Sequence, residues 1–95
     1  MIWGSKMKYK VVFTNKADKA LKRIDHSQRK IILSWLKTNL VNCEEPRKQG
    51  KALSGEKKGY WRYRVGVYRI IAKIDDTRLI IIMINISRRK DVYEF

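Results

Sequence analysis

The chain has 95 residues, enough for one small domain, and its 23 basic and 9 acidic residues give a formal charge of +14 at pH 7. A hydrophobic content of 44% with 11% aromatic residues argues against a disordered chain. A charge of this size raises affinity for polyanions. The partners to consider are therefore nucleic acid, an anionic membrane surface or an acidic protein.

Other bulk features exclude several classes of protein. Cys43 is the one cysteine and His26 the one histidine, so we expect no disulfide, no metal site and no cofactor. The longest apolar run, Leu79 to Ile84, is far too short to cross a bilayer, and the N-terminus lacks the apolar core of a signal peptide. We therefore expect a cytoplasmic protein with no membrane partner. Residues 1–95 are expected to form a single domain, with residues 1–6 as a loose extension.

The first half of the chain predicts a strand followed by a helical hairpin. Residues 8–14 alternate and then become apolar, as is typical of a strand. Asn15 is a candidate N-cap for a first helix, and Asp25 for a second, with Gln28 completing a capping-box pair. Apolar residues at helical spacing then give the second helix a wide apolar face, formed by Ile31, Ile32, Trp35, Leu36 and Leu40.

The second half predicts a polar loop over residues 42–59 and then three strands. The expected strands are Tyr60–Val65, Tyr68–Ile74 and Leu79–Ile86, with Gly66-Val67 as a two-residue hairpin turn. The last strand is apolar almost throughout, as expected of a central strand. The predicted fold is α+β: a small twisted antiparallel sheet, in the order β-α-α-β-β-β, with the helical hairpin on one face and the other face partly open.

A cationic, aromatic surface is the strongest functional signal. The stretch Lys57–Lys73 contains no acidic residue. Strand alternation places Arg62 and Arg64 on one face, and the hairpin turn brings Arg64 close to Arg69. Arginine is suited to bidentate phosphate contacts, and arginines gathered on one face repel each other unless an anion joins them. A merely solvated basic surface is the alternative.

These residues resemble the RelE/ParE superfamily of bacterial toxins from toxin–antitoxin pairs. The resemblance rests on Y-W-R-Y-R-V-G-V-Y-R-I-I in the hairpin, Leu53-Ser54-Gly55 before it, and I-N-I-S-R-R-K-D-V-Y at the end. It covers nearly the whole chain, and RelE-type messenger-RNA interferases are the closer match. It implies a ribosome-dependent endoribonuclease that cleaves mRNA in the ribosomal A site, inhibits translation and is neutralised by a cognate antitoxin.

The resemblance also implies site residues. The catalytic set would be Arg62, Arg64, Arg69, Arg89 and Tyr93, and further RNA contacts would come from Lys57, Lys58, Tyr60, Lys73, Arg88 and Lys90. The 2′-hydroxyl of the RNA would be the nucleophile. Arginines would stabilise the charge on phosphorus, and Tyr93 would transfer a proton or stack on a base. Two alternatives remain open: a ParE-like inhibitor of DNA gyrase, and a non-catalytic RNA-binding module.

Overall fold

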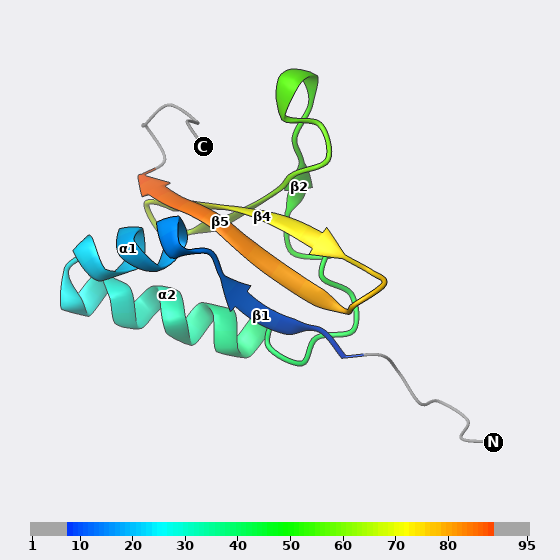
Figure 1. The fold of residues 1–95 in the computed structure, drawn as a ribbon. Helices are drawn as coiled ribbons and strands as arrows, with labels where there is room; N and C mark the ends of the chain where they lie inside the picture. Colours follow the sequence, from blue (N-terminus) through cyan, green and yellow to red (C-terminus); the bar gives the residue numbers. More distant parts are fainter. Residues whose placement is uncertain (1–7, 89–95) are drawn as a thin grey trace.

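The fold is seen in a computed structural model that describes residues 8–88 (Figure 1). Two helices precede most of a five-stranded sheet. The elements in chain order are β1 (Lys10–Phe13), α1 (Asn15–Arg23), α2 (His26–Asn39), β2 (Lys51–Ala52), the short 3₁₀ helix η1 (Gly55–Lys57), β3 (Trp61–Val65), β4 (Tyr68–Asp75) and β5 (Ile80–Arg88). No helix within this range is long and apolar enough to cross a membrane.

The sheet is mixed, with the strand order β1-β5-β4-β3-β2. The predicted antiparallel arrangement holds from β2 to β5, whereas β1 lies parallel to β5. A tight turn forces antiparallel pairing. No such turn joins β1 to β5, because both helices and three strands lie between them in sequence. The predicted central position of the last strand is confirmed, since β5 lies between β1 and β4.

Two local predictions need correction. Thr14, and not Asn15, caps α1: its Oγ1 accepts a hydrogen bond of 3.1 Å from the amide of Ala17, while Asn15 is already helical. Thr14 is extended (φ −70°, ψ 163°), as an N-cap must be. The loop over residues 42–59 also contains β2 and η1, which are too short to leave a periodic pattern. The predicted cap of α2 is correct, because Asp25 accepts from the amide of Ser27.

The core lies between the helical hairpin and one face of the sheet. Ile32 of α2 is fully buried there with Tyr63 of β3, Ile70 of β4 and Ile81 of β5. The rings of Trp35 and Tyr63 contact each other in a tilted arrangement, with centroids 5.8 Å apart. The helices therefore cover this face and leave the opposite face of the sheet to form a surface.

Hydrogen bonds join residues 46 and 47, which precede β2, to the sheet. The hydroxyl of the buried Tyr63 donates to the carbonyl of Pro46 at 2.6 Å. Next to it, Arg47 binds both carboxylate oxygens of Asp76, which also accepts from the hydroxyl of Tyr9 at 2.6 Å. The guanidinium lowers the pKa of Asp76, and the bond to Asp76 raises the pKa of Tyr9. These bonds fix where the chain enters β2.

A β-bulge divides β5 into two halves. Ile71 pairs with Asn85, but the next residue of β4, Ala72, pairs with Met83, so Ile84 is the extra residue. Before the bulge, Ile81 and Met83 are fully buried; after it, Ile86 is buried instead. The extra residue therefore keeps apolar side chains toward the helices along all of β5. It also turns Asn85 and Ser87 toward the opposite face.

Candidate nucleic-acid interface

The β3–β4 hairpin determines which arginines meet. Gly66 has φ 58° and Val67 has a negative φ, which is the combination of a type II′ turn. This turn pairs Val65 with Tyr68, and the next pair is Arg64 with Arg69. The predicted juxtaposition of these two arginines is thus a direct consequence of glycine at the first turn position.

The surface that carries them is called here the arginine face. It is the side of β3, β4 and the end of β5 that faces away from the helices, and it consists of Arg62, Arg64, Arg69, Ile71, Asn85 and Ser87. Arg64 is exposed, whereas Arg62 and Arg69 are half-buried. Ile71 between them is only 1% exposed. By register, Ile71 lies opposite Arg62 and on the same face as Arg69, so the arginine face has an apolar residue among its cations.

Asn85 and Ser87 belong to this face because of the bulge. Asn85 lies opposite Ile71, and Ser87 opposite Arg69. Neutral hydrogen-bonding groups beside a guanidinium can orient a phosphate or a sugar hydroxyl without weakening its attraction to the cation. Sequence reasoning missed them as site residues, because the apolar run that ends in Ile84 does not reveal where alternation breaks.

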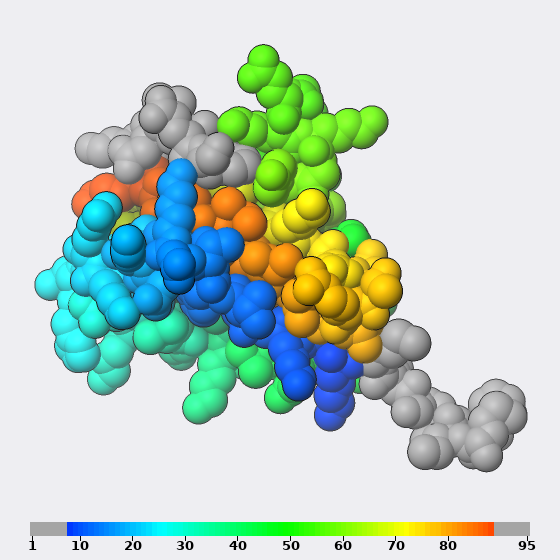
Figure 2. Space-filling view, in the orientation of Figure 1, coloured from blue at the N-terminus to red at the C-terminus, as the bar shows by residue number. Residues whose placement is uncertain are grey.

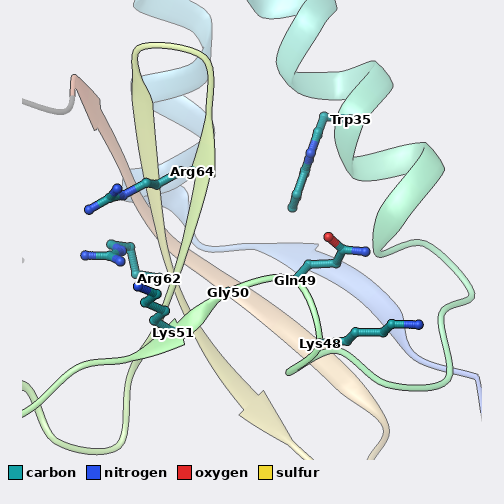
Figure 3. Close-up of a pocket in the computed structure, with 7 residues that line it drawn as sticks. All are labelled: Trp35, Lys48, Gln49, Gly50, Lys51, Arg62 and Arg64. Atoms are coloured by element: carbon teal, nitrogen blue, oxygen red, sulfur yellow. The ribbon is translucent and has the colours of Figure 1, made fainter.

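A pocket adjoins the arginine face at the edge of the sheet. It has a volume of about 360 Å³, and its lining residues are Trp35, Lys48, Gln49, Gly50, Lys51, Arg62 and Arg64 (Figure 3). β2 pairs with only the first two residues of β3, so within the described chain no strand flanks the rest of that edge. Figure 3 shows Arg62, Arg64 and Lys51 on one side of β3, with Trp35 of α2 on the other.

Two polar atoms near this pocket are buried without a hydrogen-bond partner among the described residues. They are Nε of Arg62 and Nε1 of Trp61. Gly50 packs closely against β3 and the Trp61 ring, because a Cβ there would lie 2.4 Å from the carbonyl oxygen of Arg62 and 2.5 Å from Nε1 of Trp61. Only glycine fits this position, and its backbone holds the pocket floor against β3.

The other predicted RNA-contacting residues are more dispersed. Lys57 and Lys58 lie at the end of η1, in a segment that projects from the body of the protein (Figure 2, green). Lys73 is exposed farther along β4.

Tyr60 lines a second pocket with Trp61 and Ile74 and does not line the one beside Arg62. Arg88 is paired with Tyr68, so by register it shares the helix-covered side and not the side of Arg69. Arg89, Lys90 and Tyr93 lie outside the described residues.

Other candidate chemistry finds no support. Among residues 8–88 there is no group of three or more metal-ligating side chains. Burial raises the pKa of the Cys43 thiol, which disfavours the thiolate that a nucleophile requires. His26 is exposed in the first turn of α2, a different element from the arginine face. The three arginines of the arginine face can bind and polarise phosphate groups through their guanidinium groups.

Comparison with known proteins agrees with this geometry. Residues 11–93 match the family model described as "ParE toxin of type II toxin-antitoxin system, parDE". The chain is 29% identical over 87 residues to Toxin RelG of Mycobacterium tuberculosis, covering 92% of this chain and 98% of that toxin.

Two solved structures show the same fold. One is the toxin–antitoxin complex RelBE2 of Mycobacterium tuberculosis, with a TM-score of 0.80, 26% identity, and coverage of 92% of this chain and 98% of that one. The other is the RelE–RelB complex of the archaeon Pyrococcus horikoshii, with a TM-score of 0.66, 21% identity, and coverage of 90% and 100%. The similarity thus extends over the helices, the sheet and the hairpin that carries the arginines.

Proposed function

Because the chain belongs to the RelE/ParE superfamily of toxins from type II toxin–antitoxin systems, we propose that it is an endoribonuclease that cuts messenger RNA on the ribosome. The observation that carries this proposal is the pairing of Arg64 with Arg69 on a sheet face that the helices leave uncovered. Such a face offers preorganised positive charge to a phosphate. Cleavage of message would inhibit translation in the cytoplasm.

The proposed reaction uses the RNA as its own nucleophile. The 2′-hydroxyl gives up its proton as its oxygen forms a bond to the adjacent phosphorus, the bond from phosphorus to the 5′-oxygen breaks, and that leaving oxygen takes up a proton, so the step neither gains nor loses a proton overall. Arg69 would hold the scissile phosphate and stabilise its extra negative charge, while Arg62 and Arg64 hold flanking phosphates. Arg89 is proposed to join Arg69 at the scissile phosphate.

Proton transfer needs a different group, because an arginine with a pKa above about 12 is a poor acid. Tyr93 is the proposed proton-transfer residue, with stacking on a base as its alternative role. The ribosome would supply the remaining alignment of the message, since a site that works by charge and position depends strongly on how the substrate is held.

A cognate antitoxin is the second proposed partner. The solved relatives include toxins in complex with their antitoxins, which supports a similar complex here. The charge of +14 favours an acidic or amphipathic chain that covers the arginine face. Binding there would block access of RNA to the arginine face.

The test is a map of message ends on ribosomes translating a defined mRNA, with purified protein added. We expect codon-phased cuts, and we expect Arg69→Ala to slow single-turnover cleavage by about 10²–10³-fold, as removal of a charge-stabilising donor does elsewhere. Lys19→Gln, an exposed change on α1, is the control and should cut at the wild-type rate. Unchanged cleavage in both Arg69→Ala and Tyr93→Phe would overturn the assignment of these roles.

Inhibition of DNA gyrase is the second candidate, favoured by the ParE description of the matching family model. A gyrase-mediated DNA cleavage assay run with the same protein separates the two activities. Gyrase-dependent DNA breaks without message cuts would establish the second candidate. Salt-dependent RNA binding with neither product would indicate a non-catalytic RNA-binding module.

A further inference from the structure

The pocket at the open edge of β3 extends the arginine face in one direction. Lys51 of β2 is paired with Arg62, so both side chains lie on the same face of the sheet (Figure 3). Cations therefore continue across three adjacent strands, from Arg69 on β4 through Arg62 and Arg64 on β3 to Lys51 on β2. Adjacent strands are about 4.8 Å apart, so this row follows a path crossing the strands.

The two sides of the pocket differ in chemistry. Its arginine-face side presents Arg62, Arg64 and Lys51, whereas its other side presents the indole of Trp35 and the amide of Gln49, together with one cation, Lys48 (Figure 3). Trp35 is half-buried, so part of its ring remains accessible. Cations and an aromatic wall together suit a ligand with an anionic backbone and a flat ring. A nucleotide has both, and a pocket of about 360 Å³ is within the size range of small-ligand sites.

The buried Nε of Arg62 also indicates a ligand. Because no described group accepts a hydrogen bond from it, burial of this donor carries a cost that an incoming oxygen acceptor could remove. The same guanidinium borders both the arginine face and the pocket. A phosphate held there would thus connect the cleavage site to the pocket.

We propose that this pocket is a subsite for one nucleotide flanking the scissile phosphate, with its phosphate on Lys51 and Arg62 and its base across the β3 edge against Trp35 and Gln49. This subsite rests on the proposed function, because it takes the RNA strand to run on from the scissile phosphate at Arg69. Lys51 and Trp35 are then positioning residues, because they hold the neighbouring nucleotide and do not contact the scissile phosphate.

The first experiment measures binding of a short single-stranded RNA with 2′-O-methyl sugars, which cannot be cleaved, by fluorescence anisotropy at several salt concentrations. Each phosphate contact contributes about 0.7 to the slope of log K against log salt for single strands. We expect Lys51→Gln to lower the slope by about 0.7. Lys30→Gln, an equal loss of charge on α2, should leave it unchanged; an equal effect of both variants would overturn the subsite.

The second experiment follows the indole N–H signals of the tryptophans by NMR, with Trp35→Phe used to assign the relevant signal. We expect the Trp35 signal to shift on addition of the same RNA with the affinity seen by anisotropy. No shift at saturation would overturn the proposal. Both measurements are independent of cleavage, so the two proposals can fail separately. If the wild-type protein cuts message but the binding slope and the Trp35 signal do not change as expected, the subsite alone is refuted. If both change as expected but no message is cut, the proposed activity alone is refuted.

Discussion

Replacement of Tyr63 by phenylalanine tests how β3, the strand that carries Arg62 and Arg64, is held in place. Tyr63 lies between Arg62 and Arg64 in sequence but points into the core, where it is 0% exposed and donates to the buried carbonyl of Pro46 at 2.6 Å. Phenylalanine keeps the ring contact with Trp35 but leaves that carbonyl unsatisfied. An unsatisfied buried acceptor costs about 1–3 kcal/mol. For a domain of this size, each kcal/mol corresponds to about 4–8 °C in Tm.

The same hydroxyl makes stability depend on alkaline pH. Burial raises the pKa of Tyr63 well above its ordinary value of 10.0. As the pH rises, the Tyr63 hydroxyl therefore loses its proton in the unfolded chain before it does so in the folded protein. Its contribution to the unfolding free energy is complete below pH 10 and decreases as the pH rises toward the pKa of the folded state. The slope is about 1.4 kcal/mol per pH unit for one proton. Tyr63→Phe removes this slope and leaves a smaller one from Tyr9, whose pKa is also raised.

The assay is urea unfolding followed by circular dichroism between pH 7 and pH 12. We expect the variant to lose about 1–3 kcal/mol at pH 7 and to show a flatter alkaline dependence than the wild type. Tyr9→Phe is the matched control, with a smaller loss of about 0.5–1.5 kcal/mol, because Asp76 keeps its bonds to Arg47. A hydrogen bond contributes roughly 1 kcal/mol to stability, so a difference below about 0.5 kcal/mol counts as no effect. The reasoning is refuted if the unfolding free energy of Tyr63→Phe differs from wild type by less than this and its alkaline slope is the same.

Two further changes test the electrostatics. Asp76→Asn removes the carboxylate that Arg47 holds. The pKa of Asp76 is lowered from its ordinary value of 3.8, so the carboxylate stabilises the fold above pH 3.8. This contribution is lost as the pH falls through the lowered pKa of the folded state. Acid titration of the unfolding free energy should therefore be shallower in the variant, by at most about 1 kcal/mol because the pair is exposed, and an unchanged titration would contradict this role. Arg64→Gln removes one positive charge from the arginine face, so it should weaken RNA binding and lower its salt dependence. RNA binding with the affinity and salt dependence of the wild type would argue against this expectation.

Periodicity predicted most of the fold, since the helical hairpin, the β3–β4 turn and the central place of β5 all follow from residue patterns. The parallel addition of β1 could not be predicted, because no local turn determines its direction. The cap of α1 was displaced by one residue, since Thr14 and Asn15 are both good N-cap residues. β2 is two residues long and leaves no pattern at all.

The candidate site was predictable to the same extent. Alternation and the glycine turn correctly place Arg62, Arg64 and Arg69 together, because these depend on neighbours in sequence. Asn85, Ser87, Lys51 and Trp35 come from elements distant in sequence, and their positions depend on the bulge, the β2 pairing and helix packing. Such tertiary relations leave no signal in a single sequence. The proposed roles of Arg89 and Tyr93 await the experiments described above.

The extra residue in β5 marks a place where this strand can lose one residue without changing its faces. An exchange of Ile84 for another apolar residue leaves the count unchanged, so each later side chain keeps its face. Removal of Ile84 would close the bulge, because Met83 and Asn85 would then lie opposite the consecutive residues Ala72 and Ile71. Asn85 and Ser87 would stay on the arginine face and Ile86 would stay toward the helices. Removal of one residue from the regular strand β3 would instead move every later side chain of that strand to the other face. Matched single-residue deletions in β3 and β5 would therefore reveal this difference more directly than a scan of substitutions.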